Sequence, residues 1–89
     1  MADKNNLILD DELSAVSGGM VVVGEAKVLV TGLNIRSKAD KNSSLVGQAS
    51  ISTVYFVFEI LQNQGYIWYR IGPNMWIAND GSWVRFTSK

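Results

Sequence analysis

Few side chains in this sequence have a reactive chemistry of their own. The 89 residues include no cysteine and no histidine, which removes thiolate and imidazole nucleophiles, the common zinc sites and the side chain best suited to proton transfer near neutral pH. Four carboxylates follow residue 19, and their spacing forms no recognisable catalytic pair. We therefore predict that the protein is not an enzyme and uses neither a cofactor nor a metal. These carboxylates are Glu25, Asp40, Glu59 and Asp80.

Aromatic side chains are the stronger candidates for a functional role, and that role is binding. The chain has three Trp, three Tyr and three Phe, more than one small core requires, and surplus aromatic side chains can line a ligand groove. We expect Trp68 and Trp76 to be packed. Tyr55 lies on the opposite face of its segment from Val54 and Phe56, so we expect it to face solvent. The predicted ligand-binding aromatic residues are Tyr55, Tyr66, Tyr69 and Trp83.

The elements that must position these side chains are short β-strands separated by turns. Brief runs rich in apolar and β-branched residues alternate with clusters of Gly, Asn, Asp and Pro. A polar stretch at 38–44 predicts one long exposed loop, and residues 62–65 predict the turn of a hairpin. The pattern predicts an all-β fold, a small antiparallel barrel. The predicted strands include 20–23, 26–31, 33–37, 53–61, 66–71, 75–78 and 82–86.

The first 19 residues have a different pattern. Leu9, Leu13 and Val16 fall at positions i, i+4 and i+7, so a helix would place them on one apolar stripe. Gly18 and Gly19 would end this short amphipathic helix. Helices of this length are marginally stable alone in water, so we expect the segment to be mobile until a partner binds its apolar stripe.

Charge divides the chain at the same place. Residues 1–19 hold one lysine against four acidic residues, a net charge of −3, whereas residues 20–89 hold seven basic against four acidic residues, a net charge of +3. Two segments of opposite charge suggest two separate roles. The basic residues form no dense patch, so we expect no nucleic-acid partner. No apolar run in the sequence reaches the length that spans a bilayer, so we expect no transmembrane segment.

Several of the predicted strands resemble a known domain. The segments that carry the resemblance are LNIRS at 33–37, LVG at 45–47, WYRI at 68–71 and MWI at 75–77. Their order and spacing are similar to those of bacterial SH3-type (SH3b) domains over roughly residues 26–86. The resemblance implies an SH3-like barrel with a groove for cell-wall peptides near the first segment. It adds Asn34 and Arg36 to the ligand-binding candidates, while a polar turn that satisfies backbone groups explains these two residues equally well.

The N-terminal segment resembles a second family. ELSAVSGG at 12–19 is similar to the end of the double-glycine leader peptides of bacteriocins. The resemblance implies that an ABC exporter with a peptidase domain recognises the leader and cuts after Gly19, because a close-fitting peptidase cleft favours residues without side chains beside the cut. The chain would then consist of a leader at 1–19 and an SH3b-like domain at 20–89. The residues implied in recognition and cleavage are Leu9, Glu12, Leu13, Val16, Gly18 and Gly19.

Three functions are compatible with these patterns. The first is a bacteriocin-like precursor, cytoplasmic until its leader is removed and secreted afterwards, whose barrel binds peptidoglycan or another envelope polymer. The second is an intracellular protein-interaction module whose N-terminal helix docks on a partner and is never removed. The third, a toxin that perturbs membranes, fits less well because the pattern predicts a folded barrel rather than a basic amphipathic helix.

Overall fold

The computed structural model describes residues 21–89, and they form strands and turns without a helix. The all-β prediction is therefore confirmed for this part of the chain. The predicted N-terminal helix and the six leader residues lie outside the described residues. The eight strands are β1 (Gly24–Val28), β2 (Leu33–Arg36), β3 (Leu45–Ala49), β4 (Val54–Val57), β5 (Glu59–Asn63), β6 (Tyr66–Gly72), β7 (Met75–Asn79) and β8 (Val84–Ser88).

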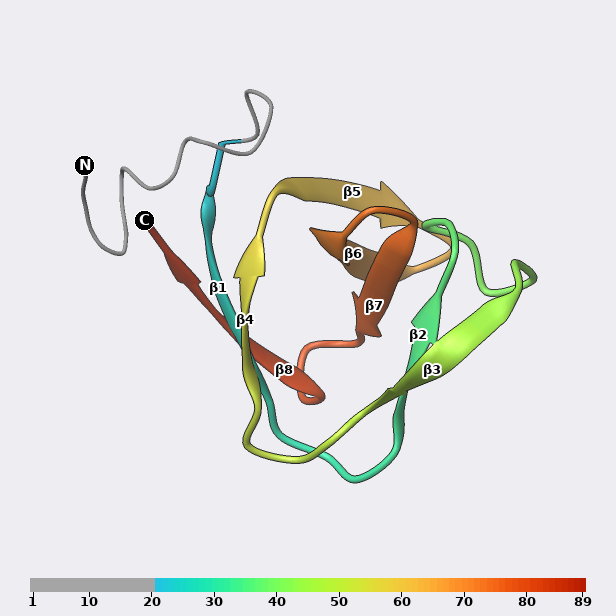
Figure 1. Cartoon of the computed structure of the whole chain (residues 1–89), viewed down its shortest axis with the longest axis horizontal. Helices are drawn as coiled ribbons and strands as arrows, with labels where there is room; N and C mark the ends of the chain where they lie inside the picture. The colour runs from blue at the N-terminus through green and yellow to red at the C-terminus, as the bar shows by residue number, and fades with distance from the viewer. Residues whose placement is uncertain (1–20) are drawn as a thin grey trace.

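The strands form two antiparallel sheets (Figure 1). Three strands pair in the order β4-β1-β8, and five pair in the order β3-β2-β7-β6-β5. The prediction of one continuous strand over 53–61 is wrong, because β4 and β5 belong to different sheets and the chain changes sheet at Phe58. The Phe58 backbone N–H donates to the Arg70 carbonyl at 2.9 Å, so pairing with β6 begins at the residue where pairing with β1 has ended.

The predicted hairpin is present as β5 and β6. Its two strands pair from Glu59–Arg70 to Asn63–Tyr66, and the turn between them consists of Gln64 and Gly65, with φ of 58° and 82°. Two successive residues with positive φ are the geometry of a type I′ turn, which matches the twist of the strands it joins. Gly adopts this conformation without strain, so the position of Gly65 fixes where the chain reverses.

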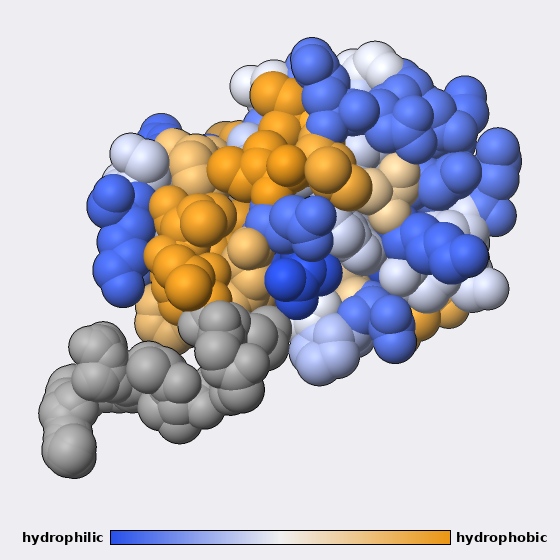
Figure 2. All heavy atoms as spheres, turned by 90° about the horizontal axis from the view of Figure 1, so that it is seen from above, coloured by the Kyte–Doolittle hydropathy of each residue, from blue (hydrophilic) through white to orange (hydrophobic). Residues whose placement is uncertain are grey.

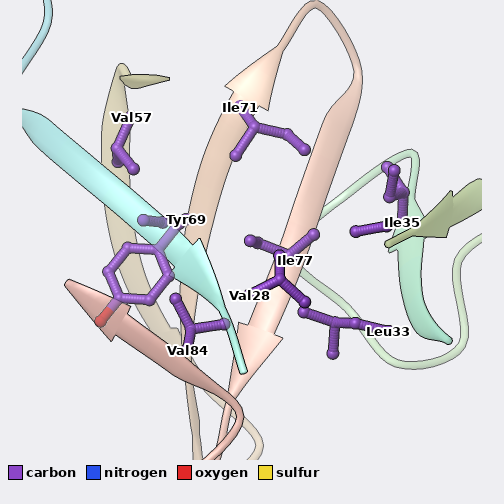
Figure 3. Close-up of a cluster of buried hydrophobic side chains, with 10 residues drawn as sticks. Val28, Leu33, Ile35, Val57, Tyr69, Ile71, Ile77 and Val84 are labelled. Atoms are coloured by element: carbon purple, nitrogen blue, oxygen red, sulfur yellow. The ribbon is translucent and has the colours of Figure 1, made fainter. Parts of the chain in front are cut away.

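One hydrophobic core lies between the two sheets (Figure 3). Strand alternation sends Ala26, Val57 and Val84 inward from the three-stranded sheet and Leu33, Ile35 and Ile77 inward from the five-stranded sheet. The predicted sides of β4 are reversed: Val57 is fully buried and Tyr55 packs against the core, whereas Phe56 is 58% exposed. The pairing with β1 decides this, because Tyr55 lies opposite the buried Ala26.

Several large apolar side chains of β4 and β5 stay exposed. They are Val54 and Phe56 on β4 and Ile60 and Leu61 on β5. Figure 2 shows apolar residues gathered over one part of the surface, beside a region covered by hydrophilic residues. No helix of the described residues is long and apolar enough to cross a membrane.

The outer face of the five-stranded sheet holds a second group of packed side chains. Trp68 and Trp76 are buried, at 1% and 8% exposure, yet neither belongs to the core cluster between the sheets. Alternation explains this, because each precedes a core residue, Tyr69 or Ile77, and so points to the opposite face. The prediction that both Trp side chains are packed is confirmed.

The predicted loop at 38–44 folds back toward the β5–β6 turn (Figure 1). The Lys41 backbone N–H donates to Oε1 of Gln64 at 2.8 Å, and Nδ2 of Asn63 donates to the Ala39 carbonyl at 2.9 Å. The loop leaves β2 and is tied to a turn two strands away in the sheet. This connection fixes one border of the outer face that carries Trp68.

Candidate ligand-binding groove

A groove of about 390 Å³ lies at the outer face of the five-stranded sheet, within the size range of small-ligand sites. Side chains of β2, β6 and β7 reach it from the sheet, and the β1–β2 connection, the 38–44 loop and the β7–β8 connection border it. Its charged, polar and aromatic lining residues are Asn34, Arg36, Lys41, Tyr66, Trp68 and Trp83, together with Thr31. The remainder of the lining is apolar or glycine.

The structure brings four of the six predicted ligand-binding residues together in this groove. Asn34 and Arg36 lie two residues apart on β2 and point to the same face, Tyr66 begins β6, and Trp83 precedes β8. These residues are far apart in the sequence, and the sheet order β2-β7-β6 is what gathers them.

Tyr55 and Tyr69 are not brought to the groove. Tyr69 is buried in the core and its ring stacks on Phe86, with centroids 5.1 Å apart and an interplanar angle of 8°. Tyr55 packs against the same core from β4. Both point inward because of the alternation of their strands, so the structure gives each a packing role.

Stacked aromatic rings form the centre of the groove. The rings of Tyr66 and Trp83 are stacked with centroids 5.4 Å apart, and Trp68 meets Tyr66 edge-on at 6.2 Å. The Trp68 indole N–H donates to the Asn63 carbonyl at 3.0 Å, which satisfies its one polar group. Tyr66 and Trp83, which are only half-buried, present apolar ring surface suited to contact with a flat or ring-shaped ligand group, and the buried Trp68 supports Tyr66 from the side.

Asn79 holds the backbone that carries Trp83 from below the surface. Its Oδ1 accepts hydrogen bonds from the backbone N–H groups of Gly81, Trp83 and Val84, at 2.9, 3.1 and 3.1 Å. Asn79 is buried, and its side chain satisfies three backbone donors of a tight connection, of which the Val84 N–H is buried and the other two are partly buried. Sequence reasoning missed Asn79, although its place at the start of an Asn-Asp-Gly turn was the available signal.

Neighbouring hydrogen bonds hold the groove's polar residues in place. Nη1 of Arg36 donates to the Ser43 carbonyl at 2.9 Å, and Oδ1 of Asn34 accepts a hydrogen bond from Nε2 of Gln48 at 3.3 Å. Arg36 is half-buried, so its guanidinium is anchored to the loop at one edge. Lys41, which sequence reasoning also missed, is exposed and comes from the middle of that loop.

Hydrogen bonds to two carboxyl groups, those of the half-buried Asp40 and the exposed Asp80, favour the ionised form of each. A hydrogen bond from the Asn42 backbone N–H, together with one from the Gln64 amide, lowers the pKa of Asp40. The pKa of Asp80 is lowered mainly by the Ser82 backbone N–H that donates to it. Within residues 21–89, no group of three His, Cys, Asp or Glu side chains is placed to hold a metal ion.

No protein-family model, curated protein or solved structure matches this chain. The groove geometry and the sequence patterns therefore carry the functional reasoning. The leader residues, from Leu9 to Gly19, lie outside the described residues, so their role stays a prediction.

Proposed function

We propose that this chain is a secreted, bacteriocin-like bacterial precursor whose SH3b-like barrel binds peptidoglycan or another cell-envelope polymer. In this proposal the leader at 1–19 is recognised by a peptidase-containing ABC exporter and removed after Gly19. The precursor is cytoplasmic and residues 20–89 are exported. The observation that carries the binding role is the groove that gathers Asn34, Arg36, Tyr66 and Trp83.

The arrangement of the SH3b-like segments supports the barrel. The segment at 33–37 supplies β2, the segment at 68–71 lies within β6, and the segment at 75–77 begins β7. These three strands are direct neighbours in one sheet, in the order β2-β7-β6. Segments that resemble one domain in sequence therefore share one surface, and that surface holds the groove.

The chemistry of the groove supports a polymer ligand. It is an open depression with a stacked aromatic centre and polar groups at its edge, so a chain can enter and leave along it. Ring and aliphatic faces of a glycan or peptide stack on aromatic side chains, while the edge groups bind its polar atoms. Hydrogen bonds already hold Arg36 and Asn34 in place before a ligand binds. Less side-chain entropy is therefore lost on binding.

Cosedimentation of the 89-residue chain with purified peptidoglycan tests the binding role. We expect Tyr66→Ala to weaken binding by about tenfold, since stacking of this kind contributes about 0.5–1.5 kcal/mol beyond the area it buries. Phe56→Ala is the matched control, because Phe56 is an exposed aromatic residue on β4, outside the groove. Equal binding by the two variants, or no binding by the parent chain, would refute the role of the groove.

Mass spectrometry of culture medium tests the leader. We expect a secreted product that begins at Met20, and we expect Gly19→Leu to abolish it because the added side chain blocks the close approach of the backbone. Ala2→Leu also replaces a small residue by leucine, at a position outside the motif, and should leave export unchanged. A full-length chain found only inside cells would contradict the leader and favour the interaction-module hypothesis.

A further inference from the structure

The charged residues that line the groove are all cationic. They are Arg36 on β2 and Lys41 in the 38–44 loop, and no carboxylate belongs to the lining. A cleft lined by one sign of charge focuses the potential and concentrates ligands of the opposite sign. The positive charge of the lining therefore favours an anionic ligand, a property that the proposed function does not specify.

Arg36 retains hydrogen-bonding capacity for a ligand. A guanidinium has five N–H donors, and within residues 21–89 the structure gives Arg36 a single side-chain hydrogen bond, from Nη1 to the Ser43 carbonyl. The one ion pair among the described residues is Arg70–Glu59, at 3.1 Å, so Arg36 has no carboxylate partner there. A half-buried guanidinium with unused donors is suited to a carboxylate or phosphate group.

The nearest loop carboxylate is occupied elsewhere. Oδ1 of Asp40 accepts hydrogen bonds from the Asn42 backbone N–H at 2.7 Å and from Nε2 of Gln64 at 3.2 Å. Asp40 is therefore held by the loop and the β5–β6 turn, and it is not part of the groove lining. It orders the loop that carries Lys41. Arg36 is close enough to Asp40 to lower its pKa, but no ion pair joins the two residues, so the remaining guanidinium donors of Arg36 can bind a ligand.

We propose that the groove selects an anionic ligand, whose carboxylate or phosphate oxygens bind Arg36 and Lys41 while the adjoining part of the ligand lies against Tyr66 and Trp83. This inference rests on the proposed function and specifies the ligand chemistry of the same site. The planar guanidinium of Arg36 supplies directional hydrogen bonds, and Lys41 supplies a second positive charge from an exposed loop. The stacked rings supply the apolar contact.

Two purified polymers distinguish the two sources of negative charge. The first is peptidoglycan stripped of phosphate polymers, before and after amidation of its carboxyl groups, and the second is poly(glycerol phosphate). If carboxylates are the ligand, amidation should lower the affinity of the 89-residue chain about tenfold or more. If phosphates are the ligand, poly(glycerol phosphate) should bind and compete with peptidoglycan. Unchanged binding after amidation, with no binding of the phosphate polymer, would overturn the proposal.

Matched charge variants distinguish binding at the groove from general electrostatic attraction to the positively charged domain. Arg36→Gln and Arg85→Gln each remove one positive charge, but Arg85 is exposed on β8, outside the groove. We expect Arg36→Gln to weaken binding about tenfold and Arg85→Gln to change it less than twofold. Lys41→Gln should also weaken binding, with Lys27→Gln on β1 as its control. Equal effects within each pair would overturn the proposal.

Failure of this inference is distinguishable from failure of the proposed function. Arg36→Lys keeps the charge and should retain part of the affinity, and thermal unfolding checks that each variant is folded. If Tyr66→Ala abolishes peptidoglycan binding while Arg36→Gln and Lys41→Gln bind as the parent does, the groove is a binding site without anion selectivity. If none of these variants changes binding, the proposed function fails as well.

Discussion

At the scale of single residues, Asn79 links stability to the candidate site. Its Oδ1 accepts three backbone hydrogen bonds in a buried position. Asn79→Ala would leave these donors without an acceptor, and each unsatisfied buried group costs about 1–3 kcal/mol. We expect the free energy of unfolding, measured in urea, to fall by about 2–4 kcal/mol, since partial access of water relieves some of the donors.

Asn42→Ala is the control for this substitution. Asn42 is exposed in the 38–44 loop, and its backbone N–H, which Ala retains, makes the hydrogen bond to Asp40. Substitutions at such sites change stability by about 0.5 kcal/mol or less. Similar unfolding free energies for the two variants would contradict the role assigned to Asn79.

The Asp40 carboxyl gives the loop a pH dependence. Its pKa is lowered by hydrogen bonds from the Asn42 backbone N–H and the Gln64 amide, so the folded state binds its proton less readily than the unfolded chain does. The stability contributed by Asp40 is thus present above the pKa of the unfolded chain, near pH 4, and is lost as the pH falls through the lower folded pKa.

An NMR titration of the Asp40 side-chain carbon measures this effect. We expect Gln64→Ala to raise the pKa of Asp40 toward its ordinary value, because one of the two hydrogen bonds to the carboxylate is removed. The pKa of Asp80, whose main hydrogen-bond donor is Ser82, should stay the same in that variant. An unchanged Asp40 pKa would contradict the role of the hydrogen bond from Gln64 to Asp40.

At the scale of elements, the pairing of β1 with β8 requires glycine at position 24. A Cβ added to Gly24 would lie 2.5 Å from Cζ of Phe86 and 2.5 Å from the Thr87 carbonyl oxygen. The backbone oxygen cannot move aside without disturbing the strand pair, and overpacking of this kind costs about 1–3 kcal/mol. We therefore expect Gly24→Ala to lower the free energy of unfolding by about 1–3 kcal/mol, measured as a lower midpoint of urea denaturation.

Gly47 on β3 provides the comparison. A Cβ there would meet nothing within 4 Å, so Gly47→Ala should leave stability unchanged or raise it by up to about 1 kcal/mol. An equal loss of stability in both variants would show that the close approach at Gly24 is not what constrains the sheet.

The elements also show where sequence patterns succeed. Turn chemistry predicted the β5–β6 hairpin, because Gly65 marks a position that requires positive φ. Alternation alone did not predict the break between β4 and β5, since apolar residues continue through Phe58 while the chain changes partners from β1 to β6. Which side of β4 faces the core follows from its pairing with β1, and no local pattern encodes that pairing.

At the scale of the whole molecule, local sequence patterns predicted some residues of the candidate site, whereas others depend on contacts between distant parts of the chain. Asn34, Arg36, Tyr66 and Trp83 could be selected from the sequence because residue type and the SH3b resemblance indicated them. Tyr69 has the same residue type, but its place in the alternation of β6 directs it into the core. Lys41 could not be predicted, because the hydrogen bond from its backbone to Gln64, 23 residues away, is what brings it to the groove.

The central claim is that this groove is the ligand-binding surface, and chemical-shift mapping tests it most directly. An isotopically labelled chain is titrated with soluble peptidoglycan fragments while the backbone amide and Trp indole signals are followed. We predict that the largest shifts occur at Asn34, Arg36, Lys41, Tyr66 and Trp83, with little change at Phe56 on the other sheet. Shifts centred on β4 and β1, or no shifts at saturating fragment, would contradict the claim.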